Sequence, residues 1–339
     1  AQKATESFGA LSTFERAAYL NKIADVFENN AAEIAAIETS VNGKTLGETN
    51  MHAAGSADMF RYFASCITAN DEKVKQHSTS NFSLIFREPI GVVGLIIPWN
   101  APVMLLAWKL APALAAGNTV VVKPSSNASI PVLYIGELLQ EILPAGVFNV
   151  VPGSGSDVGD AMLAHPGIGK ISFTGSTAVG RGIAAGAGDR LIPSTVELGG
   201  KSPVVIFDDA DIEKGLQFAM LSTFSSSGAV CVAGSRILVQ ENIYDKAIDL
   251  LKETCGRIKV GDPTEEGVQM GPIVNEKQFN KIMALCEEGE KEAELICGGR
   301  RLTGGVYDKG FYIGPTVFGK ADNSMKIARE EVFGPVLVV

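Results

Sequence analysis

Residues 91–125 read GVVGLIIPWNAPVMLLAWKLAPALAAGNTVVVKPS, and this stretch decides the fold. It begins with the apolar run Val92–Ile97, continues as a helical pattern over about 103–116, and ends with a second apolar run, Thr119–Val122. Strands that are apolar throughout and are joined by a helix are typical of a parallel sheet buried on both faces. We therefore expect an α/β protein with a doubly wound, Rossmann-type sheet.

The same alternation continues along the chain. Further apolar runs are Phe148–Val151, Lys170–Phe173 and Val204–Phe207, and further helical patterns cover about 130–142, 156–164 and 178–186. Turn motifs directly follow the expected strands, namely Pro98-Trp99-Asn100, Lys123-Pro124-Ser125, Pro152-Gly153-Ser154-Gly155 and Thr174-Gly175-Ser176. Ligands of such sheets bind beyond the carboxyl ends of the strands, so we expect a binding site there.

The regions on either side of this sheet also have readable patterns. Helices are predicted near 12–38 and 46–68, and the polar, partly alternating segment 70–89 predicts extended structure outside the core. After Lys201 a second α/β stretch is predicted, with strands near 203–207, 236–239 and 335–339 and helices near 211–224, 242–258 and 275–288. The last strand reaches Val339, which suggests that this second domain is incomplete.

Composition excludes several classes of protein. The 339 residues are 46% hydrophobic and 20% charged, which is ordinary for a globular protein. The net charge of −9 argues against nonspecific binding of nucleic acid. No apolar run approaches the roughly 20 residues that span a bilayer, and no signal peptide opens the chain. The five cysteines lack metal or redox spacing and the three histidines lie in no triad or zinc motif, so we expect a reducing, cytoplasmic location and no metal.

Cys231 is the leading candidate for a nucleophile. It follows Phe224-Ser225-Ser226-Ser227-Gly228-Ala229-Val230 and precedes Val232-Ala233-Gly234. A free cysteine is more often a small buried hydrophobe than a nucleophile. The flanking glycines and small residues nevertheless suggest a tight loop with room for a substrate. The other cysteines, which we expect to be structural, are Cys66, Cys255, Cys286 and Cys297.

Three polar residues in turns are further candidates, each with an ordinary alternative. Glu197 precedes Leu198-Gly199-Gly200 at the end of an expected strand, and it is either a general base or a helix cap or ion-pair partner. Asn100 lies at a strand-to-helix turn, where asparagine is common for its local hydrogen bonds. Lys123 ends a strand, where it is either a ligand for ribose or phosphate or a plain surface charge.

Together these motifs resemble the NAD(P)-dependent aldehyde dehydrogenase superfamily, in the order of that family and over essentially the whole chain. The matching segments are Pro98-Trp99-Asn100, Trp108–Leu114, Gly117–Pro124, Phe173–Thr177, Glu197–Pro203, the Cys231 loop and Glu330–Pro335. The resemblance implies a dinucleotide-binding domain over 1–69 and 90–200, a bridging or oligomerisation extension over 70–89, and a catalytic domain over 201–339. It also implies that the chain lacks parts of the family's two ends, and that the protein is a homodimer or homotetramer.

The resemblance further implies the role of each site residue. Cys231 would add to an aldehyde, and the thiohemiacetal would pass a hydride to NAD or NADP. Glu197 would activate the water that hydrolyses the thioester, and Asn100 would complete the oxyanion hole. Lys123 would bind the adenosine ribose, Ser176 the pyrophosphate and Glu331 the nicotinamide ribose. The remaining implied cofactor contacts are Ile97, Pro98, Trp99, Ser125, Ser126, Gly155, Phe173, Thr174, Gly175, Val179, Leu198, Gly199 and Phe333.

One departure from the family pattern bears on the cofactor, and three alternatives stay open for the activity. Ser126 stands three positions after Lys123, where NAD-dependent members often carry glutamate, so NADP should be tolerated. The alternatives are a CoA-acylating dehydrogenase, a noncatalytic structural or binding member of the family, and an inactive fragment. Glu197 argues against the first, because a base for water is useful only for hydrolysis.

Overall fold

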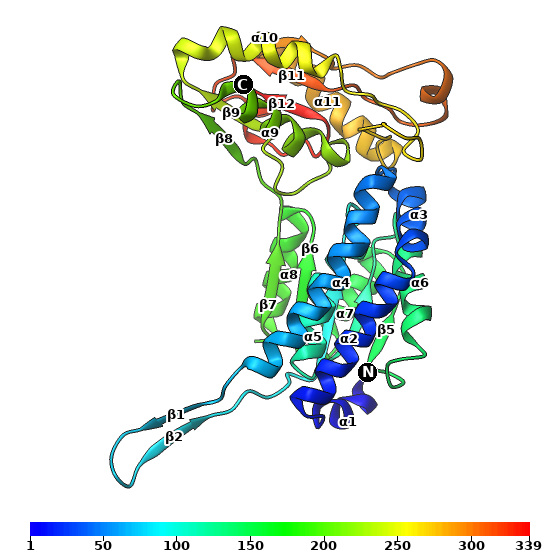
Figure 1. Ribbon diagram of the computed structural model, residues 1–339, viewed down its shortest axis with the longest axis vertical. Coiled ribbons are helices and arrows are strands. Elements are labelled where there is room, and N and C mark those ends of the chain that lie inside the picture. Colours follow the sequence, from blue (N-terminus) through cyan, green and yellow to red (C-terminus); the bar gives the residue numbers. More distant parts are fainter. The chain divides into compact units, whose positions relative to one another are not determined.

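Two five-stranded sheets, each with its own helices, organise the chain in the computed structural model, which describes residues 1–339. The first unit comprises Ala1–Glu38 and Asn50–Glu197, and the second comprises Thr39–Thr49 and Leu198–Val339. The colours of Figure 1 separate them, with blue to green in the first and mostly green to red in the second. The expected boundary put residues 39–49 in the first domain, whereas the structure places them in the second.

The sheet of the first unit is parallel throughout, in the order β5-β4-β3-β6-β7. Its strands are β3 (Val92–Ile96), β4 (Thr119–Lys123), β5 (Phe148–Val150), β6 (Lys170–Thr174) and β7 (Ser194–Glu197). The strand order runs outward in one direction from β3 to β5 and in the other from β6 to β7. The direction reverses between β3 and β6, which is where a doubly wound sheet binds its ligand.

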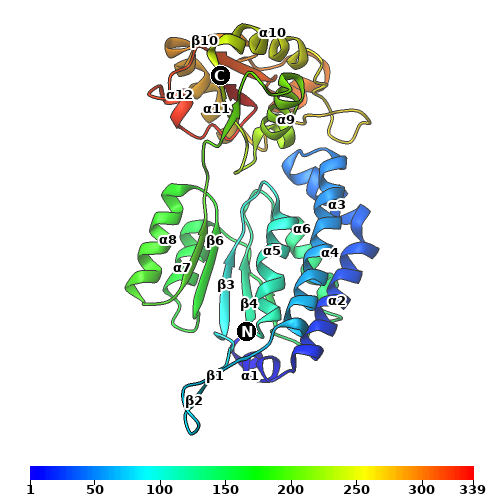
Figure 2. The same ribbon diagram turned by 60° about the vertical axis from the view of Figure 1, so that its left-hand side comes forward.

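Helices cover both faces of this sheet, as expected for apolar parallel strands. Figure 2 shows α7 and α8 on one side and α5, α6, α2 and α4 on the other. The helices of this unit are α1 (Thr5–Gly9), α2 (Thr13–Asn29), α3 (Ala31–Asn42), α4 (Leu46–Ala69), α5 (Pro102–Ala115), α6 (Ile130–Leu139), α7 (Asp160–Ala164) and α8 (Thr177–Asp189). The C-terminal end of α3 and the N-terminal turn of α4 lie within Thr39–Thr49 and therefore belong to the second unit.

Most predicted elements of this unit are present, with three differences. The pattern over 12–38 is two helices rather than one, and Phe14 in the first turn of α2 is 73% exposed. The strand expected to end at Glu197 is present as β7, but its sequence Ser-Thr-Val-Glu is polar and its residues are mostly exposed at the edge of the sheet. The run Val204–Phe207, counted both in the first alternation and in the second α/β stretch, belongs to the second sheet alone.

The segment 70–89 forms an antiparallel hairpin of β1 (Lys73–Gln76) and β2 (Phe82–Ile85). Both strands are exposed along their whole length, and the hairpin extends away from the first sheet and its helices (Figure 1). The prediction of extended structure outside the core is confirmed. None of the helices in the protein is both long enough and apolar enough to cross a membrane.

The second unit has a mixed sheet in the order β10-β11-β12-β9-β8. Its strands are β8 (Pro203–Ile206), β9 (Arg236–Val239), β10 (Glu294–Cys297), β11 (Thr316–Gly319) and β12 (Val336–Val338), and its longer helices are α9 (Ile212–Phe224), α10 (Tyr244–Cys255), α11 (Glu276–Glu292) and α12 (Lys326–Arg329). Only the pair β10–β11 is antiparallel. Strands β10 and β11 were not predicted, and each is only four residues long.

Alternation along the central strands creates two cores, one on each face of the second sheet. Val317 and Leu337 pack with α9 and α10, whereas Phe318 and Val336 pack with α11 and α12. Successive side chains of a strand point to opposite faces, so a strand buried on both faces must be apolar at every position. This is the reason why the run Pro335–Val339 reads as continuous hydrophobic sequence.

Candidate active site

The loop that follows β3 carries Asn100 and three of the implied cofactor contacts, Ile97, Pro98 and Trp99. The Ile97 N–H donates to the Lys123 carbonyl at 3.0 Å, so the loop leaves the sheet beside the end of β4. Asn100 is 7% exposed and lies two residues before Pro102, the first residue of α5. Proline is favoured at that position because its missing N–H has no partner within the helix. The turn therefore holds the Asn100 amide at the carboxyl edge of the sheet.

Lys123 and Ser126 converge on one carbonyl oxygen at the same edge. The Lys123 ammonium donates to the carbonyls of Pro124 at 2.8 Å and Gly153 at 3.0 Å, and the Ser126 hydroxyl donates to that of Gly153 at 3.2 Å. Lys123 is buried, and burial lowers the pKa of its ammonium group. Lys123 is therefore an oriented donor at the binding edge and not a plain surface charge. Ser125 starts the turn, where its hydroxyl accepts from the Asn127 N–H at 3.3 Å.

The carboxyl end of β6 has the features of a site for a dinucleotide. The hydroxyl of Thr174 is enclosed and has no hydrogen-bond partner in the protein. Ser176 caps α8, since its hydroxyl accepts from the Val179 N–H at 3.4 Å. The N-terminus of a 13-residue helix presents unpaired N–H groups and a partial positive charge, which suit a pyrophosphate. Gly175 is required here because a Cβ atom would lie 2.5 Å from the ring of Phe173.

Two further predicted positions are exposed, one after β6 and the other after β5. Val179 is 53% exposed in the first turn of α8, an apolar surface on which a flat ring can lie. Gly155 begins a short π-helical turn, Gly155–Gly159, after Ser154 caps it by accepting from the Asp157 N–H at 3.0 Å. The predicted cofactor residues of the first unit thus lie at the carboxyl ends of its strands, in the loops that follow them and in the first turn of α8, which fits a dinucleotide.

Glu197 is the last residue of β7, next to the end of β6. The Gly175 N–H donates to the Glu197 carbonyl at 3.1 Å, and Glu197 is paired with Thr174 in the sheet, so both residues lie at the same edge. The strand that carries it is polar and exposed, which corrects the expectation of an apolar strand. The alternative of a helix cap is wrong, because no helix begins at this residue.

A buried lysine that the sequence pattern did not single out lies near Glu197. Lys109 is in α5, is 9% exposed, and donates to the Ser172 hydroxyl at 3.0 Å. Burial lowers the pKa of Lys109 to about 8, while the negative charge of Glu197 acts in the opposite direction. The sequence did contain a sign of this role, because Lys109 is the one charged residue in the otherwise apolar helix Pro102–Ala115. Lys109 therefore supplies a positive charge to the surroundings of the Glu197 carboxylate.

In the second unit, Glu331 packs directly against the paired glycines that follow Leu198. A Cβ atom at Gly199 would lie 2.0 Å from the Glu331 carboxylate, and the Gly200 N–H donates to that carboxylate at 3.4 Å. A Cβ atom at Gly200 would also lie 3.9 Å from the Cys231 carbonyl. Gly199 thus allows the close approach of the Glu331 carboxylate to this backbone, whereas the Cys231 carbonyl lies at ordinary contact distance from Gly200.

Two lysines surround Glu331, and neither was predicted as a site residue. Burial raises the pKa of Glu331, and the Gly200 N–H, Lys281 and Lys201 oppose this rise. Lys281 donates to the Glu331 carbonyl at 3.2 Å. The Lys201 ammonium is enclosed without a hydrogen-bond partner, and its burial lowers its pKa to about 8. The available signal for Lys201 was its position directly after the paired glycines, whereas Lys281 lies in a charged helix that has no such motif.

The loop that carries Cys231 has an unusual backbone. Ser226, Ser227 and Gly228 have φ values of 55°, 53° and 76°, three successive residues in the left-handed region. A Cβ atom at Gly228 would lie 2.0 Å from the Gly334 carbonyl oxygen, so the loop packs against the backbone that follows Phe333. Phe333 itself has a φ of 55°. Left-handed conformations of residues other than glycine persist only where the surrounding structure holds them, and they cluster at functional sites.

The other four cysteines lie in different surroundings. Cys255 and Cys297 share a hydrogen bond between their thiols, which raises the pKa of Cys255 and lowers that of Cys297 to about 7. Cys286 is fully buried and its burial raises its pKa to about 11. Cys66 interacts with Tyr62 on the exposed face of α4. Cys231 is the cysteine that lies in a glycine-flanked loop beside predicted cofactor residues.

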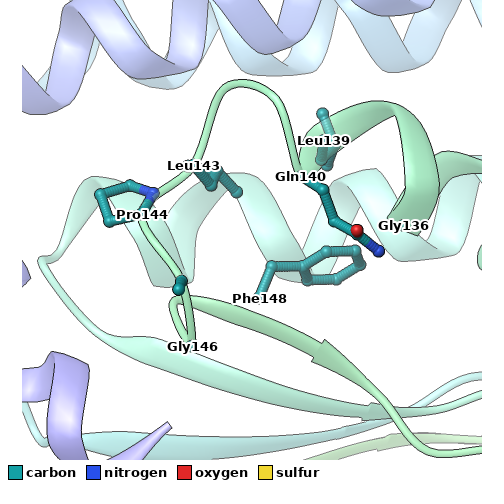
Figure 3. Close-up of a pocket in the computed structure, with 8 residues that line it drawn as sticks. Gly136, Leu139, Gln140, Leu143, Pro144, Gly146 and Phe148 are labelled. Atoms are coloured by element: carbon teal, nitrogen blue, oxygen red, sulfur yellow. The ribbon is translucent and has the colours of Figure 1, made fainter.

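A surface pocket elsewhere in the first unit is not part of this site. It lies between the end of α6 and the start of β5, at the opposite end of the strand from the loops described above (Figure 3). Its lining residues include no acid, base or thiol; they are Gly136, Leu139, Gln140, Leu143, Pro144, Ala145, Gly146 and Phe148. These groups offer no nucleophile and no proton donor for catalysis.

Comparison with known proteins shows a family that this chain resembles along its whole length. The model of the aldehyde dehydrogenase family matches residues 1–339. The chain is 43% identical over 338 residues to a chloroplastic betaine aldehyde dehydrogenase of Beta vulgaris, covering 98% of this chain and 67% of the beet protein. It is 36% identical to a betaine aldehyde dehydrogenase of Staphylococcus aureus solved with NAD+, at a TM-score of 0.97, covering 100% of this chain and 68% of that one. The fold and the order of the motifs are thus shared with these enzymes.

Proposed function

Because this chain belongs to the aldehyde dehydrogenase family, we propose that Cys231, Glu197 and Asn100 carry out its oxidation of an aldehyde to a carboxylic acid. The observation that supports these roles most strongly is the Cys231 loop. Its left-handed backbone and its contacts with the residues next to Glu331 and Phe333 distinguish it from the other four cysteines. The family model extends over the whole chain, which disfavours a purely structural role for a chain that keeps all three residues.

Each residue has one chemical task in the proposed mechanism. The Cys231 thiolate attacks the carbonyl carbon of the aldehyde, and the Asn100 amide donates to the oxygen on which negative charge develops. After oxidation the substrate is held as a thioester on Cys231. Glu197 then accepts a proton from a water molecule, which attacks the thioester, releases the carboxylic acid and regenerates the thiol. A carboxylate in this position favours hydrolysis over transfer to CoA.

The predicted cofactor residues would hold a nicotinamide cofactor. When bound, its oxidised nicotinamide ring supplies the hydride acceptor. Lys123 and Ser126 would hold the adenosine ribose, and the Thr174 hydroxyl with the α8 N-terminus would hold the pyrophosphate. Glu331 would accept from the hydroxyls of the nicotinamide ribose. The unpartnered Thr174 hydroxyl and the capped N-terminus of α8 support this assignment.

The first aldehyde to test is betaine aldehyde, because the beet and S. aureus relatives are both named for it. Initial rates over a panel of betaine aldehyde, aliphatic aldehydes and aromatic aldehydes would identify the class. A kcat/KM for an uncharged aldehyde equal to or above that for betaine aldehyde would show that betaine aldehyde is not the preferred substrate.

A mechanism that uses a free thiol suits a reducing compartment, and we therefore propose that the protein is located in the cytoplasm. Imaging of the tagged protein in its native cell would test this location.

We expect this enzyme to use both NAD and NADP, with kcat/KM values within about two orders of magnitude, or about 2.7 kcal/mol. The reason is that Ser126 shares the Gly153 carbonyl with Lys123, so it lies beside the proposed ribose site and carries no charge. Ser126→Glu would repel a 2′-phosphate and should raise the KM for NADP. Steady-state kinetics with each cofactor measure this ratio. A wild-type enzyme that rejects NADP, or an unchanged ratio in Ser126→Glu, would show that another group controls the choice.

We propose that the β1–β2 hairpin joins copies of this chain into a dimer or tetramer. Its exposed apolar side chains are Val74, Phe82, Leu84, Ile85 and Phe86, each between 49% and 71% exposed. Contiguous exposed apolar surface of this kind marks interaction sites. Val74 and Leu84 are paired across the hairpin, so the double variant Val74→Lys/Leu84→Lys should lower the molar mass measured by light scattering. Phe14→Lys, on α2, serves as the control, and an unchanged mass in the hairpin variant would exclude this interface.

A further inference from the structure

We propose that Glu48 is a positioning residue for Cys231, acting through the backbone of Ser226; this inference rests on the proposed role of Cys231 as the nucleophile. Glu48 lies in the first turn of α4, 183 positions before Cys231 in the sequence. It belongs to the segment Thr39–Thr49, which the fold incorporates into the second unit. None of the motifs around Cys231 includes it.

The contacts of Glu48 show that its two carboxylate oxygens have separate tasks. Oε2 accepts from the N–H and the hydroxyl of Thr45, both at 3.0 Å, which closes a capping box at the start of α4. Oε1 accepts from the Ser226 N–H at 2.5 Å and from the Ser226 hydroxyl at 3.1 Å. One side chain therefore ties the start of a helix to the loop of the nucleophile.

The second partner of Ser226 completes a short relay of hydrogen bonds. The Lys44 ammonium donates to the Ser226 hydroxyl, which in turn donates to Glu48 Oε1. Lys44 is 5% exposed and Ser226 is 9% exposed, so these bonds form away from bulk water. Hydrogen bonds in which one partner is ionised are shorter and stronger than neutral ones, and water does not compete with them here.

Ser226 needs an anchor of this kind because of its backbone. Its φ of 55° and that of Ser227, 53°, lie in the left-handed region, where a side chain with a Cβ atom is disfavoured. Such a conformation persists only where its surroundings hold it. Ser227 has its own anchor, since its hydroxyl donates to the Gly271 carbonyl at 2.8 Å. Glu48 supplies the corresponding anchor for the Ser226 N–H, which is the first left-handed position of the loop.

The consequence concerns catalysis rather than folding alone. The turn at Ser226–Gly228 sets the direction in which the chain enters Val230 and Cys231. A displacement of about 1 Å at a reacting atom can cost roughly 10²-fold in rate. If the Ser226 N–H loses its acceptor, the turn can relax toward right-handed conformations, and Cys231 moves with it. The loss should then appear in kcat and leave the cofactor affinity unchanged.

The chain offers a matched control in a second capping box. Glu15 in α2 accepts from the N–H and the hydroxyl of Ser12 at 2.8 Å and 2.7 Å, in the same arrangement as Glu48 and Thr45. Glu15 is exposed and belongs to the first unit, whereas the Cys231 loop belongs to the second. Glu15→Ala therefore removes the same helix cap without removing the anchor. A purely structural role for Glu48 predicts that the two alanine variants behave alike.

The experiment compares kcat, the KM for NAD and the melting temperature of Glu48→Ala, Glu48→Gln, Glu48→Asp and Glu15→Ala in the full chain. We expect kcat to fall about 10–100-fold in Glu48→Ala, with the KM for NAD unchanged, and to stay at the wild-type value in Glu15→Ala. Glu48→Gln keeps the side-chain length and an oxygen acceptor, so it should restore most of kcat. Glu48→Asp keeps the charge in the first turn but is too short to reach Ser226, so it should be impaired.

Equal kcat values in Glu48→Ala and Glu15→Ala, or a normal Glu48→Asp beside an impaired Glu48→Gln, would overturn the proposal. The Gln and Asp variants decide the question even if Glu48→Ala does not fold. Cys231→Ala, measured in parallel, separates this failure from a failure of the proposed function. If Cys231→Ala is inactive while Glu48→Ala equals wild type, the positioning role alone is wrong; if Cys231→Ala is active, Cys231 is not the nucleophile.

Discussion

Cys231→Ala should abolish aldehyde oxidation while leaving cofactor binding intact. Without the thiol no thiohemiacetal forms, and the step that delivers a hydride has no covalent substrate to start from. The cofactor groups Lys123, Thr174 and Ser176 belong to the other unit and are unchanged, so binding of NAD should persist. Steady-state rates at saturating aldehyde and NAD measure the first quantity, and fluorescence titration with NADH measures the second.

Matched controls come from the other cysteines. Cys286→Ala removes a buried thiol that packs in the core of the second unit, and it should change stability more than turnover. Cys66→Ala changes a thiol on the surface of α4 and should change neither. Turnover by Cys231→Ala above a few per cent of wild type would reject its role as nucleophile. The same rejection would follow if one of the two control variants lost activity while remaining folded.

Glu197→Gln should slow hydrolysis of the thioester more than the formation of reduced cofactor. Loss of a general base typically costs on the order of 10²–10⁴-fold in the step that it assists. Glutamine has nearly the same shape, and the Gly175 N–H that donates to the Glu197 backbone carbonyl is unaffected, so the edge of the sheet should keep its geometry. The variant should therefore accumulate acylated Cys231.

Stopped-flow absorbance of reduced cofactor distinguishes the two steps. A rapid burst of about one equivalent per active site, followed by a slow phase, is the expected result for Glu197→Gln. Mass spectrometry of the quenched protein should show the acyl group on Cys231. A slowed burst with an unchanged later phase would mean instead that Glu197 activates Cys231 for its attack on the aldehyde.

Local sequence determined much of the first sheet. Residues 92–96 and 119–123 are buried at nearly every position, and only a sheet covered on both faces accommodates such strands. The turns after these strands could therefore be placed at one edge of the sheet from their sequence alone. The order of the motifs Asn100, Glu197 and Cys231 also identified the family, because it depends on residue types and their sequence and not on contacts.

Other features could not be predicted because they depend on neighbouring elements. Strand β7 was expected to be apolar but is polar and exposed, and it is a strand because β6 supplies its backbone hydrogen bonds. Strands β10 and β11 are short, and each pairs with the other in the folded chain.

The residues missed at the site have the same physical explanation. Lys109, Lys201 and Lys281 read as ordinary lysines in sequence, and two of them have lowered pKa values only because the fold buries them. Glu48 reads as half of a capping box, as Glu15 does. What separates these two glutamates is the placement of residues 39–49 in the second unit, against the loop of Cys231. Residue types and their periodicity determined the fold class and the proposed reacting groups, whereas burial and long-range contacts, which tertiary structure alone creates, decided which side chains surround them.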